Sequence, residues 1–354
     1  MTRLAFFIVP LLVSVFPVTS YSWQVAGQSS GSPQKTAGGA QTDERPVFRG
    51  GTANVEVDVD VIRSRRPVRG LTAADFEIKD EGKEQRILTL ARDSTPLDIV
   101  LLLDVSGSVR LYLPEMAAIS RAALRKLLPE DRVSLMIFSR DSLIEQEFTN
   151  SPSEIEHAIE KASAEEPPGS GTRIYAAVVQ AARYLAFERQ GQLRRRAILI
   201  VTDNNGLSYS VHRDMALRSL YEANCTLDAL VIGKHPHPPP PRMGSVINPD
   251  FAFDDVFLLA AQTGGEAITA KKPKGSFGDM LNRIRDRYLL MYRVPNGAQP
   301  GTFRKIEVDL GPAAKRKYPH ASVSARTGYY VGKQSVSRSS SLRLLTWHPP
   351  RQVG

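Results

Sequence analysis

Three oxygen-bearing side chains, Asp104, Ser106 and Ser108, follow an apolar run that begins at Ile99. A carboxylate and two hydroxyls so close together are hard ligands of the kind that Mg²⁺, Mn²⁺ and Ca²⁺ prefer in proteins. We expect Gly107, which has no Cβ, to let the chain turn tightly between the two serines. The stretch therefore predicts the first loop of a divalent-cation site at the end of a buried strand.

Two later segments offer further oxygen ligands in a similar setting. Thr172 follows the Gly-Ser-Gly turn of residues 169–171 and precedes a helical pattern, whereas Asp203 ends the apolar run of residues 198–202. Ligands from several loops are needed to hold an ion, and the loops of a parallel α/β sheet gather beyond the carboxyl ends of its strands. The three segments together predict one site.

The elements that must position these residues are strands that alternate with helical patterns from residue 96 onward. Such alternation is typical of βαβ units around a parallel sheet. The predicted strands are residues 97–103, 132–138, 143–148, 197–202, 226–232 and 266–269. The predicted helices are residues 113–128, 152–163, 173–188, 211–223, 253–262 and 276–287. Six strands with helices on both faces predict a doubly wound, mostly parallel α/β fold with Asp104 at its ligand-binding end.

Segments that alternate with a period of two flank this α/β region on both sides, which is typical of strands with one buried face. Before it they are residues 55–61, 76–79 and 87–90, with residues 80–83 predicted as the turn between the last two. After it they are residues 288–293, 305–310 and 321–325. We therefore expect residues 46–95 and 288–330 to pack on each other as a small, sandwich-like β domain, outside the α/β domain of residues 96–287.

The candidate ligands also carry a resemblance to a known family. Asp104, Ser106 and Ser108 form an Asp-x-Ser-x-Ser motif, residues 171–177 read Gly-Thr-Arg-Ile-Tyr-Ala-Ala, and Thr202-Asp203 ends a later strand. In this order and spacing, the motifs resemble the metal-ion-dependent adhesion site of von Willebrand factor type A domains, whose fold is Rossmann-like. Three flanking segments resemble a bacterial group related to this family, so that the likeness spans about residues 48–330. These segments are residues 70–76, 80–83 and 326–330.

The resemblance implies a role for each ligand. It implies that Ser106 and Ser108 bind the ion directly, and that Asp104 binds it directly or through water. Thr172 would supply a ligand from the second loop, and Asp203 would accept a hydrogen bond from a metal-bound water. The implied ion is Mg²⁺, with Mn²⁺ or Ca²⁺ as alternatives. The glycine that usually follows the third-loop aspartate is displaced here by two positions.

The first residues are typical of a secretory signal. Arg3 precedes an apolar run at residues 4–18, and small residues follow it. The run is shorter than the roughly 20 residues that a membrane-spanning helix needs, so a retained anchor is the less favoured alternative. We expect residues 1–22 to be a signal peptide, residues 23–45 a flexible linker and the protein to be secreted or periplasmic.

Composition and charge narrow the function further. The 354 residues are 42% apolar and 23% charged, which is ordinary for a globular protein. Cys225 is the only cysteine, so an intrachain disulfide is excluded, and its position before an apolar strand predicts a buried, inert thiol. The net charge is +9, and residues 271–354 hold 17 Lys and Arg against four Asp and Glu. This basic end favours acidic partners or an anionic membrane surface. Nucleic acid is less favoured, because no nucleic-acid-binding motif is present. We expect the tail at residues 331–354 to be mobile.

A second candidate metal site is less favoured. His235 and His237 lie in a proline run that extends to Pro241, and no cysteine, aspartate or third histidine is close to them in sequence. Because consecutive prolines favour a polyproline II conformation, the segment predicts a stiff, exposed recognition loop rather than a soft-metal site.

Motifs for catalysis are lacking. The sequence contains no Gly-x-Ser-x-Gly elbow, phosphate-binding loop, His-Glu-x-x-His or Cys-x-x-Cys motif, and His157 and His212 fall within or beside helical patterns. We therefore expect no enzyme but an exported, cation-dependent binding module whose metal ion completes its coordination with an acidic residue of a protein partner. A metal-independent envelope scaffold and, less favoured, a metal-dependent hydrolase are the alternatives.

Overall fold

The computed structural model describes residues 54–92, 95–188, 193–208, 211–233, 252–253 and 255–332. The predicted signal peptide, the linker, the proline run and the chain from residue 333 onward lie outside the described residues. In the described part of the chain, no helix is both long and apolar enough to cross a membrane.

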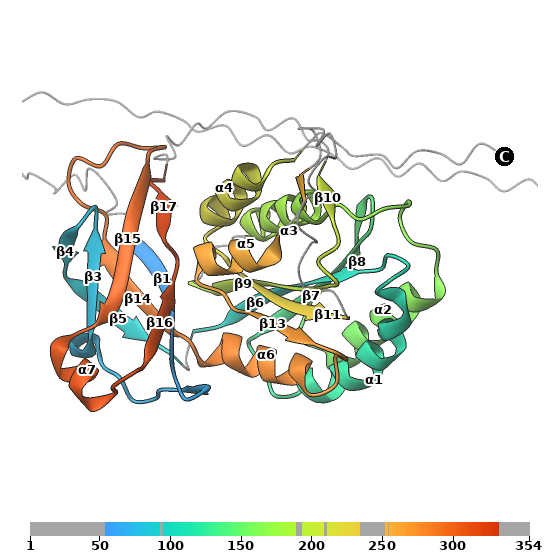
Figure 1. The fold of residues 1–354 in the computed structure, drawn as a ribbon, viewed down its shortest axis with the longest axis horizontal. Helices are drawn as coiled ribbons and strands as arrows, with labels where there is room; N and C mark the ends of the chain where they lie inside the picture. The colour runs from blue at the N-terminus through green and yellow to red at the C-terminus, as the bar shows by residue number, and fades with distance from the viewer. Residues whose placement is uncertain are drawn as a thin grey trace, which may run out of the picture. The chain divides into compact units, whose positions relative to one another are not determined.

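A six-stranded sheet with the order β13-β11-β9-β6-β7-β8 forms the middle of the chain (Figure 1). All neighbouring strands are parallel except β8, which runs antiparallel to β7. Every residue of β6 and β9 is buried, as expected of strands that are covered on both faces. The strands are β6 (Leu97–Asp104), β7 (Arg132–Phe138), β8 (Ser142–Thr149), β9 (Arg195–Thr202), β11 (Thr226–Ile232) and β13 (Ala267–Ala270).

Helices cover both faces of this sheet (Figure 1). On one face, Leu101 and Leu103 pack in a core with α1 (Leu113–Leu124), α2 (Pro152–Ala164) and α6 (Ser276–Asp286). On the other face, Val100 and Leu102 pack with α3 (Ile174–Phe187), α4 (Arg213–Ala223) and α5 (Val256–Thr263). The predicted doubly wound fold is therefore confirmed, and so is each of its six strands and six helices, although α1 ends four residues earlier than predicted.

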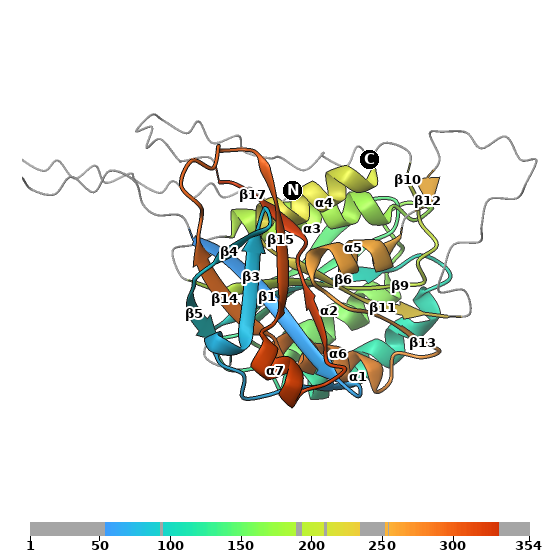
Figure 2. The same cartoon turned by 60° about the vertical axis from the view of Figure 1, so that its left-hand side comes forward.

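Most strands outside this sheet form two further sheets (Figure 2). These two sheets share one core, in which Val57, Ile78, Leu290 and Ile306 are buried. One sheet has the order β16-β1-β14-β5 with β2 beside β1, and the other has the order β17-β15-β3-β4. The first comprises β1 (Asn54–Arg63), β2 (Arg66–Pro67), β5 (Ile87–Ala91), β14 (Tyr288–Arg293) and β16 (Ser322–Ala325). The second comprises β3 (Phe76–Asp80), β4 (Lys83–Gln85), β15 (Phe303–Leu310) and β17 (Gly328–Tyr330). We call these strands the β module; segments from before and after the α/β sheet pair directly in it, as β1 does with β14.

Short elements connect the larger ones and were not predicted. They are η1 (Ala73–Asp75), η2 (Arg110–Tyr112), β10 (Leu207–Ser208), β12 (Ala252–Phe253) and α7 (Pro312–Lys317). Strands β10 and β12 pair with each other outside the three larger sheets.

The predicted turn at residues 80–83 is present, but a strand that was not predicted, β4, directly follows it. Residues 80–83 do form a turn, in which Glu81 and Gly82 have φ angles of 50° and 73°. The turn joins β3 to β4, however, and β5 pairs with β14 in the other sheet. Strand β4 was not predicted because it is too short and polar to show a period of two.

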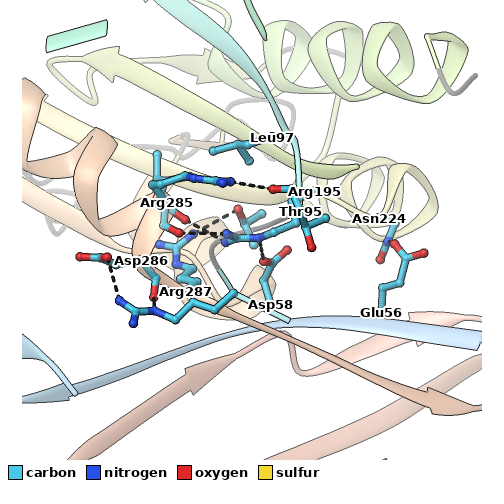
Figure 3. A network of polar contacts seen from close by, with 12 residues as sticks. Glu56, Asp58, Thr95, Leu97, Arg195, Asn224, Arg285, Asp286 and Arg287 are labelled. Carbon is cyan, nitrogen blue, oxygen red and sulfur yellow. Dashed lines mark hydrogen bonds and ion pairs between the residues drawn. The ribbon is translucent and has the colours of Figure 1, made fainter. Parts of the chain in front are cut away.

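A buried ion pair joins the β module to the α/β sheet (Figure 3). Arg195, at the start of β9, has a side chain that is 1% exposed and lies 2.5 Å from Asp58 Oδ1 of β1. The same guanidinium donates hydrogen bonds to the carbonyls of Ile284 and Arg285 in the last turn of α6, at 2.8 and 3.1 Å. One side chain thus satisfies a carboxylate of the module and two of the carbonyls that a helix end leaves without partners.

A second pair lies deeper. Arg287, between α6 and β14, binds both carboxylate oxygens of Asp228 on β11 at 2.9 and 2.5 Å, and both side chains are 0% exposed. Burial lowers the pKa of Arg287, but the charge and hydrogen bonds of Asp228, together with the charges of Asp60 and Asp58, raise this pKa by more. The net shift is upward, and the guanidinium stays charged. The backbone of Gly264 also lies very close to the backbone of Arg326. The φ angle of Gly264 is 78°, and a Cβ at this position would lie 2.5 Å from the backbone nitrogen of Arg326.

The single cysteine offers a test of this packing. Cys225 is buried, and burial raises the pKa of its thiol to about 12. At pH 8 roughly one thiol in ten thousand would then be a thiolate. We expect a thiol reagent such as DTNB to label the folded protein far more slowly than the protein in concentrated urea. Equal labelling rates in the two conditions would contradict the burial of Cys225.

Candidate functional site

Asp104 is the last residue of β6 and is fully buried. Its Oδ1 accepts a hydrogen bond from the backbone N–H of Ser106 at 2.9 Å, and its Oδ2 accepts one from Thr202 Oγ1 at 2.7 Å. The carboxylate is thereby held between its own loop and the end of β9, on the side of β6 where the strand order reverses. Asp104 therefore lies at the carboxyl end of β6, at the switch point of the sheet.

The electrostatics of Asp104 favour a cation beside it. Burial raises the pKa of its carboxyl to about 6, against the lowering effect of its hydrogen bonds to Ser106 and Thr202, and the nearby Asp203 raises it further. Among the described residues, no lysine or arginine forms an ion pair with Asp104. A divalent ion would supply the positive charge that this buried carboxylate lacks.

The two serines come from one turn. Ser106 Oγ and Ser108 Oγ lie 3.5 Å apart; Ser106 is buried and Ser108 is exposed. The backbone N–H groups of Val109 and Arg110 donate to Ser106 O at 3.0 and 2.9 Å and close the turn. The expected need for glycine between the serines is wrong, because Gly107 has no left-handed φ and a Cβ there would meet no atom within 4 Å.

Thr172 lies on a loop that is tied to the same edge of the sheet. Ser139, directly after β7, donates from Oγ to the carbonyls of Pro168 and Gly169 at 2.8 and 2.9 Å, and its own carbonyl accepts from Arg173 N at 2.9 Å. The residue before Ser139 pairs with Asp104 across β7 and β6. Thr172 is partly exposed on this edge, although within the described residues it forms no hydrogen bond with the other four candidate ligands.

Asp203 directly follows β9 and is 9% exposed. Its Oδ1 accepts a hydrogen bond from Asn205 N at 3.1 Å. The next residue, Asn204, has a φ of 59°, a left-handed conformation that asparagine tolerates better than most residues. Its Oδ1 also accepts from Val256 N at the start of α5, at 3.1 Å. Asn204 therefore makes the turn for which the related motif uses glycine, and it anchors the loop as well.

Sequence reasoning gave no role to Thr202 or Asn204. Thr202 orients Asp104 and also accepts from Asn204 N through its hydroxyl, at 3.1 Å. The signal was available, because a threonine at the end of an apolar strand and an asparagine directly after Asp203 are both visible in the sequence. What the sequence does not show is that β6 and β9 are neighbours, which brings the Thr202 hydroxyl to Asp104.

The donor set suits a hard cation. It comprises two carboxylates and three hydroxyls, and among the described residues no cluster of three or more His, Cys, Asp and Glu side chains is found. Neutral hydroxyl ligands leave much of the charge of a divalent ion uncompensated. Such a set fits Mg²⁺, Mn²⁺ or Ca²⁺ that retains affinity for a further anionic ligand.

His157 and His212 lie on α2 and at the start of α4. His157 on α2 has a side chain that is 83% exposed and lies 3.8 Å from Glu160. His212 is exposed at the start of α4. Neither contacts a candidate ligand among the described residues.

Residues 99–206 match the family model of the von Willebrand factor type A domain. The match covers β6, the Thr172 loop and β9 with Asp203, and the sheet has the doubly wound order described above. The chain therefore contains a von Willebrand factor type A domain, hereafter the A domain.

Solved structures with a similar fold share little sequence with this chain. A von Willebrand factor type A protein from Catenulispora acidiphila is 11% identical, over 77% of this chain and 76% of that chain, with a TM-score of 0.41. Manganese-loaded TRAP protein from Plasmodium vivax is 13% identical, over 63% and 95%, with a TM-score of 0.40. Proximal thread matrix protein 1 from the mussel byssus, with a zinc-occupied MIDAS motif, is 13% identical, over 56% and 49%, with a TM-score of 0.41. A comparison with curated proteins finds no match.

Proposed function

We propose that this protein is an exported, divalent-cation-dependent binding module. The cation is held by Asp104, Ser106, Ser108, Thr172 and Asp203, and Mg²⁺ is the first candidate, with Mn²⁺ or Ca²⁺ as alternatives. The observation that carries the proposal is the setting of Asp104, a buried carboxylate at the switch point with two serine hydroxyls beside it. When bound, the ion would offer an open coordination position to a carboxylate of a partner protein.

The residues of the chain have distinct tasks in this proposal. Thr202 and the Ser106 N–H fix both oxygens of Asp104, so that the carboxylate does not rotate. Ser106 and Ser108 present hydroxyls from one turn, and the exposed Ser108 marks the side from which a partner approaches. Asn204 holds Asp203 at the edge by anchoring its loop to α5.

The proposal extends to the organisation of the chain. Residues 96–287 form the cation-binding A domain, and residues 46–95 and 288–330 form the accessory β module. Residues 1–22 direct export, which gives a secreted or periplasmic location. Domains of this family are generally interaction modules, and both carboxylates of the donor set are assigned to the cation site, so we favour binding over hydrolysis.

The two serines give the sharpest test of the proposed site. We expect the double variant Ser106→Ala, Ser108→Ala to lose measurable Mg²⁺ and Mn²⁺ binding in calorimetry, against a wild-type Kd of about 10⁻⁴ to 10⁻³ M, typical of extracellular oxygen sites. Ser151 and Ser153 are the matched control, because their hydroxyls also lie close together, at 3.0 Å, but at the start of α2. The variant Ser151→Ala, Ser153→Ala should bind the ions like the wild type. Unchanged affinity in the Ser106, Ser108 variant would refute the site.

A further inference from the structure

The edge of the sheet that carries the candidate cation site continues to a loop of lysines. Lys271, Lys272 and Lys274 follow β13 directly and are all exposed. Among the described residues, none of the three forms an ion pair. We call residues 271–274 the lysine loop. Because β13 is parallel to β11, β9 and β6, its carboxyl end lies at the same edge as Asp104.

The strand register places the lysine loop relative to the site. Leu103 pairs with Val201, Val201 with Leu230, and Leu230 with Ile268, so that these residues form one row across four strands. Ser106 and Lys271 each follow the row by three residues, on β6 and β13 respectively. Neighbouring strands are about 4.8 Å apart, which puts the two positions about 14 Å from each other along the edge.

Charge differs between the two flanks of the cation site. Toward β8, the loops carry the exposed acids Asp141 and Glu166, near the exposed Arg140. Toward β13, the three positive charges of the lysine loop outnumber two negative ones. The latter are Asp279, exposed in the first turn of α6, and Asp255, whose carboxylate caps α5. An acidic chain that crosses the edge is therefore attracted toward β13 and repelled from the β8 side.

We infer that the partner is an extended acidic segment of a protein, which presents one carboxylate to the cation site and a second acidic group to the lysine loop. This inference rests on the proposed function. An extended chain advances about 3.3 Å per residue, so the two acidic residues are four or five positions apart. The cation site makes the ion-dependent contact with the segment. The lysine loop makes a salt-dependent contact and determines the direction in which the segment crosses the edge of the sheet.

The inference can be tested with defined peptides. The probes are fluorescent synthetic peptides with two aspartates separated by three or four neutral residues, with one aspartate, and with two adjacent aspartates. Their binding to the full chain is measured by anisotropy in Mg²⁺ and in chelator, at low and high salt. The variant replaces Lys271, Lys272 and Lys274 with serine. The control variant replaces Lys315, Arg316 and Lys317 with serine, because these residues are exposed on α7 of the β module and carry the same charge.

We expect the spaced peptide to bind the wild type about three- to tenfold more tightly than the other two peptides at low salt, with a smaller difference at high salt. The Lys271, Lys272, Lys274 variant should lose this advantage and keep the Mg²⁺ affinity of the wild type, and the control variant should keep both.

Several results would overturn the inference. One is that the wild type and the lysine-loop variant bind the spaced peptide with equal affinity. Another is that the control variant loses as much affinity for this peptide as the lysine-loop variant does. A third is that protein which binds Mg²⁺ binds none of the peptides. Chelator-insensitive binding to phosphatidylglycerol vesicles that requires the lysine loop would overturn it in favour of a membrane contact. Failure to bind Mg²⁺ at all is a different outcome, because it removes the proposed function itself.

Discussion

Replacement of Asp104 by alanine should abolish the binding of Mg²⁺ and Mn²⁺ while the fold persists. Asp104 is the fully buried carboxylate of the candidate site, and it orders both the Ser106 turn and the Thr202 hydroxyl. Burial raises the pKa of Asp104 to about 6, which means that its hydrogen bonds do not fully offset the free-energy cost of desolvating the charged carboxylate. We therefore expect the unfolding midpoint in chelator to stay near that of the wild type, whereas calorimetry with either ion should show no heat of binding.

Two companion variants make this result specific. Asp104→Asn keeps the size of the side chain and removes its charge, so it should lose the ion even if the alanine variant leaves a cavity. Asp141→Ala removes an exposed carboxylate from the same edge of the sheet and should bind like the wild type. Ion binding by Asp104→Asn at wild-type affinity would show that the carboxylate charge is not part of a cation site.

The second large effect concerns the buried ion pair between Asp228 of β11 and Arg287, the residue that directly precedes β14 of the β module. Asp228→Ala leaves the Arg287 guanidinium buried without its partner and removes the acceptor of Glu266 N, which lies 2.8 Å from Asp228 Oδ1. Breaking a buried pair from one side typically costs about 3–5 kcal/mol. We expect a loss of this size in the free energy of unfolding, measured in urea with the slope of the transition checked against the wild type.

The matched control is an exposed pair in the β module. Lys305 and Glu307 lie 2.8 Å apart with side chains 66% and 53% exposed, so Glu307→Ala should leave the unfolding transition where it is. The double variant Asp228→Leu, Arg287→Met should recover most of the stability, because it removes both buried charges and keeps apolar volume. A cost for Asp228→Ala no larger than that of Glu307→Ala would mean that the pair is open to water in solution.

These two predictions belong to opposite ends of the same sheet. Asp104 lies at the carboxyl end of β6. Arg195, which binds Asp58 of the β module, and the Arg287–Asp228 pair lie at the other end of the A domain. In Figure 3, the Arg195 side chain contacts Asp58, and the Arg285 side chain donates a hydrogen bond to the carbonyl of Thr95. We therefore expect variants of this junction to alter stability and to leave the intrinsic ion affinity of the folded protein unchanged.

The sequence by itself determined the architecture of the A domain and the identity of the candidate ligands. Strands β6 and β9 are buried on both faces, so their continuous apolar sequences predict strands directly. In helices such as α3, the spacing of the apolar residues predicts which side is buried. Asp104, Ser106 and Ser108 lie within one turn, so their proximity follows from their spacing alone.

Tertiary structure alone decided the contacts between elements far apart in the chain. The Thr202 hydroxyl meets Asp104 because β9 and β6 are neighbours. Strand β5 pairs with β14, which lies about 200 residues later in the chain. The ion pairs Arg195–Asp58 and Arg287–Asp228 could not be predicted either, because the sequence does not distinguish a buried arginine from an exposed one. Local pattern encodes which face of an element is apolar, but which elements meet depends on the packing of the whole chain.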